Sequence, residues 1–261
     1  MPANDRLDPE RIKANLTTSR IGREILVYSS TSSTNDIAAE YAKNKKNDGL
    51  VIFTEEQTAG RGRAGTKWYT GRADSTICSI VLTKVKPRPE LLSLTCAVAV
   101  AEAVGAGARI KWPNDIILNG KKVAGILLES RLQGRTAVCI LGIGINCHQS
   151  SGSFPAELRS AATSIDIEGR NTSDRISLAK RLLTLLDHWL EAALQDSEKV
   201  LERWRQLSIQ LGHRVTLVFN GRSFSGNCIG IDPQKGLIVQ LDTGGVRMFD
   251  SAHTTIVRQS R

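Results

Sequence analysis

The sequence of 261 residues lacks several features that would place it in a class at once. Its cysteines, Cys78, Cys96, Cys139, Cys147 and Cys228, form no C-x-x-C pair and are odd in number. This favours reduced, buried thiols over a disulfide framework or a zinc site. No run approaches the ~18 apolar residues of a membrane span, and the N-terminus has no apolar segment typical of a secretory signal. We therefore expect a cytoplasmic, globular protein that does not enter a membrane.

Common phosphate-binding and nucleophile motifs are also absent. Residues 60–65, GRGRAG, have the glycine spacing of a dinucleotide fingerprint, but the following TKWYTGRADST does not predict the helix that the fingerprint requires. A Walker A loop is excluded because Thr66 precedes Lys67, and no serine lies in a G-x-S-x-G elbow. What remains is a glycine-rich loop with Arg61, Arg63 and Lys67. These cations suit the stabilisation of phosphate charge.

The net charge of +9 raises the question of nucleic-acid binding, because a basic surface attracts phosphate without regard to sequence. The cations, however, are spread along the chain and form no tail. Only residues 1–23 precede the first predicted strand, which leaves no room for a helix-turn-helix module. The charge therefore favours a solvated basic surface, able to help dock an acidic partner, and we expect no specific DNA binding.

Apolar patterning predicts a mixed α/β fold followed by a small all-β part. Period-2 and β-branched runs predict strands at 24–28, 50–56, 75–83 and 136–146, whereas helical spacing predicts helices at 35–44, 91–106 and 174–194. From Leu211 onward, short strand candidates alternate with the turn dipeptides Asn220-Gly221 and Gly244-Gly245, which is typical of a small barrel. The expected division is a domain at 1–210 and a β-barrel domain at 211–261.

The dipeptide Asn119-Gly120 predicts a type I′ hairpin, since both central residues must adopt positive φ. The turn places Ile117 opposite Lys122 and Asp115 opposite Ala124, so Asp115 and Lys122 lie diagonally on one face. Apolar residues line both faces of this ribbon, and a lysine there usually has an anionic partner. An internal ion pair without functional role, a snorkelling side chain and a lysine that meets a ligand anion all remain open.

Two glycines, Gly142 and Gly144, interrupt the otherwise solid strand GIGIN. Glycine weakens a strand and often marks a place where a ligand or another backbone comes close. Crowding against a neighbouring helix explains the two glycines equally well.

Four segments, SSTND, TEEQTAGRGRAGTKW, KWPNDIILNGKKVAGILLES and GIGIN, closely resemble in order and separation those of the biotin protein ligases. The resemblance covers about Ile21 to Cys147 and extends weakly into the C-terminal part. It implies an α/β (α+β) fold, with a mixed-sheet catalytic domain like those of class II aminoacyl-tRNA synthetases and lipoate ligases, followed by a small β-barrel. It also implies the short form of the family, without the N-terminal DNA-binding domain.

The resemblance assigns roles to individual residues. It implies biotin contacts at Ser33, Thr34, Asn35, Gln57, Arg61, Gly62, Arg63, Lys122, Gly125, Gly142 and Gly144. It implies ATP contacts at Arg63, Trp68, Lys111, Asn114, Asp115, Lys122 and Asn146, with Arg63 and Lys122 as the catalytic residues and no protein-bound metal. Ala64 and Thr66 stand where many relatives have further arginines, so this loop carries fewer cations.

The implied activity has two steps. Biotin and ATP, which brings Mg²⁺ with it, give biotinyl-5′-AMP, and the biotinyl group then passes to a lysine of a biotin carboxyl carrier protein domain. The glycine-rich loop is expected to act as a lid over the adenylate, and the resemblance implies a homodimer. A lipoate-protein ligase, which uses the same adenylation logic on a related fold, and a DNA-binding regulator remain alternatives, and a Rossmann oxidoreductase is the weakest.

Overall fold

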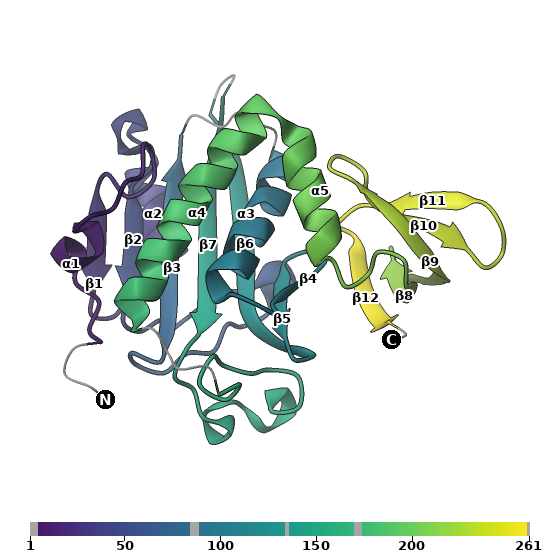
Figure 1. Cartoon of the computed structure of the whole chain (residues 1–261), viewed down its shortest axis with the longest axis horizontal. Coiled ribbons are helices and arrows are strands. Elements are labelled where there is room, and N and C mark those ends of the chain that lie inside the picture. Colours follow the sequence, from purple (N-terminus) through teal and green to yellow (C-terminus); the bar gives the residue numbers. More distant parts are fainter. Residues whose placement is uncertain (1–4, 84–88, 134–135, 170–173, 260–261) are drawn as a thin grey trace.

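The computed structural model describes residues 5–83, 89–133, 136–169 and 174–259. It contains a seven-stranded mixed sheet and a separate five-stranded antiparallel sheet formed by the C-terminal residues (Figure 1). The predicted mixed α/β fold with a small all-β part is confirmed. None of the helices in these ranges is long and apolar enough to cross a membrane.

The seven-stranded sheet has one parallel pair, β1 with β2, and its other neighbours are antiparallel. Its order is β1 (Ile25–Tyr28), β2 (Val51–Thr54), β3 (Ser75–Leu82), β7 (Thr136–Asn146), β6 (Lys121–Gln133), β5 (Asp115–Leu118) and β4 (Arg109–Lys111). The long antiparallel strands β3, β7 and β6 form its centre. Gly125 of β6 and Gly144 of β7 pair near one end of these strands, at the start of β6 and the end of β7.

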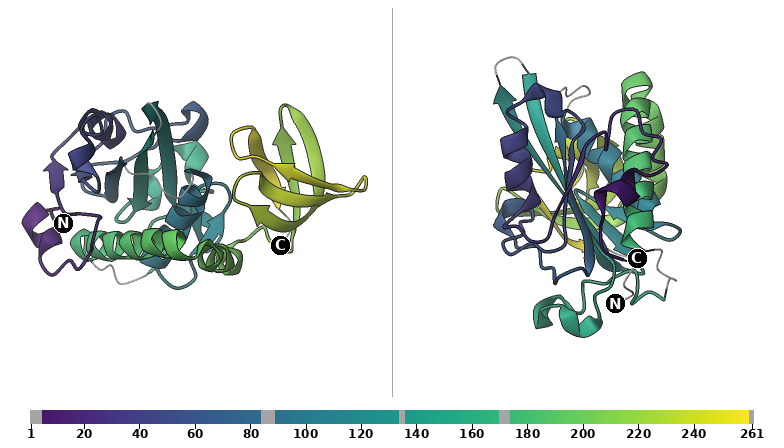
Figure 2. Two further views of the ribbon diagram at one scale, coloured as in Figure 1. Left: turned by 90° about the horizontal axis from the view of Figure 1, so that it is seen from above. Right: turned by 90° about the vertical axis from the view of Figure 1, so that its left-hand side faces the viewer.

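Helices cover both faces of this sheet (Figure 2). They are α1 (Pro9–Lys13), α2 (Thr34–Tyr41), α3 (Pro89–Val104), α4 (Arg175–Gln195) and α5 (Ser197–Leu207). Successive side chains of β2 point to opposite faces of the sheet. Val51 and Phe53 join the core that includes α3 and α4, whereas Ile52 packs with Ala38 of α2. The sheet therefore separates α2 from the larger helical layer.

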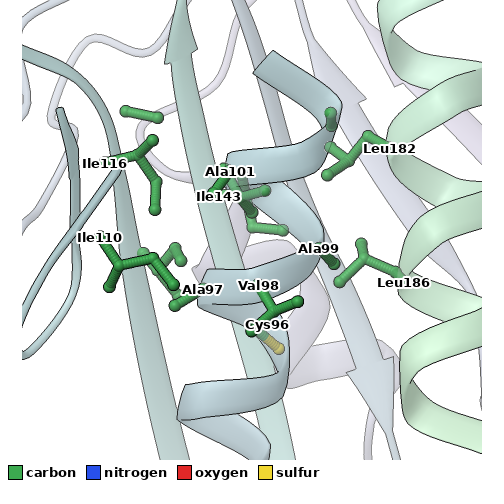
Figure 3. Close-up of a cluster of buried hydrophobic side chains, with 14 of the residues drawn as sticks. Cys96, Ala97, Val98, Ala99, Ala101, Ile110, Ile116, Ile143, Leu182 and Leu186 are labelled. Carbon is green, nitrogen blue, oxygen red and sulfur yellow. The ribbon is translucent and has the colours of Figure 1, made fainter. Parts of the chain in front are cut away.

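The predicted apolar stripe of α4 is confirmed. Its residues Ala179, Leu182, Leu183, Leu186, Leu190 and Ala193 are all buried. Leu182 and Leu186 point toward α3, with Leu186 beside Ala99 (Figure 3). Helix α3 also contacts strands β4, β5 and β6 of the sheet. Helix α3 is thus sandwiched between α4 and the sheet, which explains why it is apolar all round. Helix α5 was not predicted from the sequence.

The β5–β6 hairpin confirms part of the predicted register and corrects the rest. Both residues of the predicted turn have positive φ, 48° and 82°, and Ile117 pairs with Lys122 as expected. Beyond that pair a β-bulge adds one residue to β6, so Asp115 pairs with Gly125, where Ala124 was predicted. A bulge leaves one residue without a partner and cannot be seen in the alternation of side chains alone.

The C-terminal sheet has the order β11 (Val246–Phe249), β10 (Gly236–Leu241), β9 (Arg222–Asp232), β8 (Arg214–Phe219) and β12 (Thr254–Gln259). It lies beside β4 and α5, at the edge of the larger sheet (Figure 1). The short strands predicted from Leu211 onward correspond to β8, β9, β10 and β11. The sequence did not predict β12, which returns to pair with β8.

The five cysteines are free and buried, as predicted. Cys78 lies in the central strand β3, and burial raises the pKa of its thiol to about 12. A thiol with so high a pKa stays protonated at neutral pH and is a poor nucleophile.

A buried charge cluster ties the N-terminal residues to the sheet. The side chain of Arg175 is 1% exposed, and its guanidinium donates hydrogen bonds of 2.7 Å to Asp5 and 2.7 Å to Glu55. Burial acts to raise the pKa of Asp5, but the hydrogen bonds and the charge of Arg175 outweigh it, so the pKa is lowered. The cluster therefore depends on Arg175 staying in place.

We expect Arg175→Met to lower the free energy of unfolding by about 3–5 kcal/mol at neutral pH, because two buried carboxylates lose their cation. Urea denaturation measures this, with Arg205→Met as the matched control in an exposed ion pair on α5. The lowered pKa means that the contribution of Asp5 is complete above its unfolded pKa of ~3.9 and is lost as the pH falls through the folded value. The difference between wild type and variant should therefore narrow in acid, and equal stabilities at neutral pH would contradict the cluster's role.

Candidate active site

Two adjoining cavities lie where the arginine loop, residues 60–68, meets the seven-stranded sheet. The inner cavity, about 290 Å³, is enclosed by the start of α2, the arginine loop and the glycines of β6 and β7. The outer cavity, about 760 Å³, is enclosed by the β4–β5 region, residues 154–162 and β12. Five residues line both cavities and form their common wall: Thr66, Lys67, Trp68, Asp115 and Lys122.

The structure brings all the sequence-predicted site residues to these cavities. Every residue with an implied biotin contact lines the inner cavity: Ser33, Thr34, Asn35, Gln57, Arg61, Gly62, Arg63, Lys122, Gly125, Gly142 and Gly144. Of the implied ATP contacts, Arg63 and Asn114 line the inner cavity, Lys111 and Asn146 line the outer one, and Trp68, Asp115 and Lys122 line both. Segments far apart in the sequence thus converge on one site, whereas the individual roles remain predictions.

The start of α2 presents a set of neutral polar groups. Ser33 is the N-cap residue but makes no side-chain capping bond. The backbone N–H and the hydroxyl of Thr34 donate to Oε1 of Gln57 at 2.8 and 3.1 Å. Because its oxygen is engaged in this way, the Gln57 amide presents its Nε2 donors elsewhere. This end of the inner cavity therefore suits a neutral ligand group that both donates and accepts hydrogen bonds.

The glycines of β6 and β7 make room for one aromatic ring. Gly125 and Gly144 pair across the two strands, and the indole of Trp68 lies against both. A Cβ added at Gly144 would come within 2.6 Å of Trp68, and one added at Gly125 within 3.0 Å. At Gly142 the close neighbour is Asn35 of α2, whose Oδ1 would lie 2.4 Å from an added Cβ. Neighbouring side chains, one of them on a helix, account for both glycines of GIGIN.

Trp68 carries a polar atom without a partner. Its indole Nε1 is buried and has no hydrogen-bond acceptor among the described residues. A buried donor left without an acceptor costs about 1–3 kcal/mol. An acceptor supplied by a ligand, or a small movement of the ring, would remove this cost.

Lys122 lies at the junction of the two cavities. Its Nζ is 2.6 Å from Oδ1 of Asp115, and the two side chains are 35% and 24% exposed. The same nitrogen lies 5.5 Å from the centre of the Trp68 ring. Of the alternatives left open by the sequence, the ion pair between Lys122 and Asp115 is present. Both side chains line both cavities, so an anionic ligand in either cavity could take the place of Asp115.

The arginine loop reaches across to the C-terminal sheet. The guanidinium of Arg63 donates to the backbone carbonyls of Ser251 and, at 2.9 Å, of Thr254. Burial lowers the pKa of Arg63, against the opposing effect of the charge on Asp115. Arg63 thus lines the inner cavity while its donors are held by neutral acceptors next to β12. Sequence reasoning missed these acceptors, because no local pattern indicates which distant carbonyls a side chain will meet.

Acidic residues around the loop were also missed. Arg61 forms a two-pronged pair with Asp36, at 2.9 and 2.6 Å, and lies 3.9 Å from Glu129. The hydrogen bonds to Asp36 raise the pKa of Arg61. Asp36 ends the segment SSTND, and Glu129 lies near the end of KWPNDIILNGKKVAGILLES. Their place within two of the four segments was the only sequence signal that they lie near the site.

The site as a whole offers a neutral polar end, an aromatic wall and a cationic junction. A profile of the Biotin/lipoate A/B protein ligase family matches residues 27–146, which carry most of these groups. The biotin–[acetyl-CoA-carboxylase] ligase of Mycobacterium tuberculosis is 32% identical, over 97% of this chain and 97% of its own length. The chain belongs to the biotin protein ligase family.

Two further proteins are similar to the chain over most of its length. The bifunctional ligase/repressor BirA of Bacillus subtilis is 29% identical over 94% of this chain and 78% of its own length. The biotin protein ligase of Aquifex aeolicus, solved in complex with biotin and ATP, superposes with a TM-score of 0.76 at 22% identity. The match covers 90% of this chain and 99% of that one and shows a common fold.

In this biotin protein ligase a substitution at Gly144 tests how closely Trp68 packs against β7 at the wall between the cavities. We expect Gly144→Ala to displace Trp68 and to lower the free energy of unfolding by about 1–3 kcal/mol, the usual cost of overpacking. Urea denaturation and near-ultraviolet circular dichroism measure the two effects. Gly152→Ala is the matched control, because its nearest neighbour would be 3.9 Å away. Wild-type stability together with an unchanged aromatic signal would contradict the close packing.

Proposed function

We propose that the chain activates biotin with ATP to biotinyl-5′-AMP and transfers the biotinyl group to a lysine of a biotin carboxyl carrier protein domain. One observation carries the proposal: the inner and outer cavities meet at Lys122. A reaction between two bound molecules needs such a junction, because it holds the reacting atoms side by side. The names of the relatives support the choice of biotin, ATP and a carboxylase.

The inner cavity fits the chemistry of biotin. Its ureido ring is neutral, donates through two N–H groups and accepts through one carbonyl, which matches the hydroxyl and amide groups of Ser33, Thr34 and Gln57. The rest of the molecule is apolar and ends in a carboxylate. With the ring at the start of α2, the carboxylate would extend toward Lys122, and ATP would occupy the larger outer cavity beside Trp68, Lys111 and Asn146.

The first step brings two anions together. An oxygen of the biotin carboxylate attacks the α-phosphorus of ATP, a new O–P bond forms, and the bond to the β-phosphate oxygen breaks as pyrophosphate leaves. Lys122 would exchange Asp115 for these anions, and Arg63 would exchange two carbonyls for phosphate oxygens. A guanidinium attracts a charged phosphate oxygen more strongly than it attracts a neutral carbonyl oxygen, so the second exchange is favourable. Held in a site with little water, these cations stabilise the charge that builds up on the phosphate.

The second step transfers the acyl group. The neutral amine of a carrier lysine attacks the acyl carbon of the mixed anhydride, the bond from that carbon to the phosphate oxygen breaks, and AMP leaves while the attacking nitrogen loses one proton to water. The glycine-rich arginine loop covers the inner cavity and would shield the anhydride from water before the carrier arrives.

Magnesium is proposed to arrive with the nucleotide. Among the described residues no three histidine, cysteine, aspartate or glutamate side chains are grouped to hold a metal ion. Mg²⁺ keeps several waters and prefers phosphate oxygens to an all-protein cage. When bound, it would neutralise part of the phosphate charge, a task in which Lys122 and Arg63 share.

The remaining proposals concern partners and organisation. The carrier domain of a biotin-dependent carboxylase is the proposed protein substrate, and no specific DNA binding is proposed, since the cations form no tail. We also propose that residues 1–210 form the catalytic domain and residues 211–261 a smaller one. A cytoplasmic location, with which the five free, buried thiols agree, and a homodimer remain predictions.

ATP–pyrophosphate exchange in the presence of magnesium tests the proposed function. The assay is run in parallel with biotin, with lipoate and with no acid, and we expect exchange that depends on biotin. Exchange with lipoate alone would support a lipoate ligase, which the matched family also includes. No exchange with either acid would contradict the proposed first step.

We expect Lys122→Ala to slow adenylate formation by at least ~100-fold, the scale of losing one stabiliser of developing charge. Single-turnover formation of biotinyl-5′-AMP measures this rate apart from product release. Lys121→Ala is the matched control, because the neighbouring lysine in the same hairpin lines neither cavity. Near-normal adenylation by Lys122→Ala would remove its assigned role.

A further inference from the structure

Arg61 is the residue of the arginine loop whose charge is matched by carboxylates. Its two terminal nitrogens donate to both oxygens of Asp36 in α2, and one of them lies 3.9 Å from Glu129 in β6. Asp36 follows the polar start of α2, and Glu129 lies on the strand that carries Lys122 and Gly125. Arg61 is therefore held from two elements that together form the walls of the inner cavity.

Glu129 connects this ion pair to the polar end of the cavity. Its Oε2 accepts a hydrogen bond of 2.8 Å from Nδ2 of Asn35. The other end of that amide, Oδ1, accepts a hydrogen bond of 2.6 Å from Ser79 and lies against Gly142. Asn35 is 4% exposed. Because both ends of a buried amide are engaged, its orientation is set by Glu129 and Ser79.

Holding Arg61 also holds the rest of the loop. Arg61 and Lys67 form an isolated antiparallel bridge. Around it, the N–H of Gly62 donates to the carbonyl of Thr66 at 2.7 Å, and the N–H of Trp68 donates to the carbonyl of Gly60 at 3.0 Å. The loop is thus a small closed turn, and a restraint on Arg61 is passed to Trp68 and to the residues between them.

We propose that Asp36 and Glu129 are positioning residues that clamp Arg61, so that the arginine loop and the biotin end of the inner cavity keep one arrangement. The inference rests on the proposed function and refines it, because it assigns the side chain of Arg61 to fixing the arginine loop in place. Neither carboxylate is among the described residues that line the two cavities, so both act through Arg61 and Asn35.

The clamp is suited to a part that must open. The side chains of Arg61, Asp36 and Glu129 are 40%, 50% and 39% exposed, so water screens each interaction. Loss of the clamp should therefore loosen the loop without unfolding the chain. A glycine-rich loop has much conformational freedom to lose, so modest interactions decide how often it opens.

The test uses Asp36→Asn and Glu129→Gln, singly and together, with Glu40→Gln as the matched control. Glu40 lies on the same helix, α2, and pairs at the surface with Lys43. The first measurement, made without ligand, is the rate of trypsin cleavage after Arg63, with cleavage after Arg205 in α5 as the reference for global unfolding. The second is the dissociation constant of biotin, measured by calorimetry without ATP.

We expect the double variant to be cleaved after Arg63 about tenfold faster and to bind biotin about tenfold more weakly, the scale of losing two partly exposed ion pairs. Glu40→Gln should change neither value. Adding Asp36→Asn to Arg61→Gln should weaken biotin binding no further than Arg61→Gln alone, because the carboxylate acts through that arginine.

Unchanged cleavage in the double variant would overturn the clamp, as would faster cleavage with unchanged biotin binding or full additivity with Arg61→Gln. Failure of the wild type to bind biotin would refute the proposed function instead. The cleavage measurement needs no ligand, and it would then decide on its own whether the carboxylates hold the loop.

Discussion

The contact between the indole of Trp68 and the backbone of two paired strands is the constraint on which the site depends. Gly125 and Gly144 face each other in β6 and β7, and a single added carbon at either would meet the ring. The ring in turn separates the inner cavity from the outer one and flanks Lys122. A tryptophan delivered by a loop can hold this place only because the strands beneath it have no side chains there.

Three cations of the site are held by acceptors of the protein itself. Lys122 is paired with Asp115, Arg61 with Asp36, and Arg63 with carbonyls next to β12. Several positive charges can therefore lie close together without a bound anion, since each has a local acceptor. The acceptors differ in kind: Lys122 and Arg61 are paired with carboxylates, whereas Arg63 is held by neutral carbonyls. A phosphate that replaces the neutral carbonyls on Arg63 adds a charge attraction, whereas the carboxylate on Arg61 already supplies one.

The sequence predicted the periodic parts of this molecule well. The stripe of α4 and the type I′ turn follow from local rules, because spacing and φ preference act within a few residues. The bulge that moves Asp115 opposite Gly125 has no such signal, and neither does the pairing of β12 with β8, which joins segments far apart in the chain. Motif resemblance located the lining of both cavities. It did not indicate Glu129 or Ser251, because these side-chain and carbonyl partners are set by tertiary packing.

Strand β12 gives the end of the chain a direct place in the site. Ile256 and Val257 line the outer cavity, and the carbonyls that hold Arg63 belong to Ser251 and Thr254. The two sheets are thus joined by the arginine loop as well as by the covalent link after α5. The pairing of β12 with β8 therefore also fixes part of the lining of the outer cavity, so the smaller sheet supports the site as well as extending the chain.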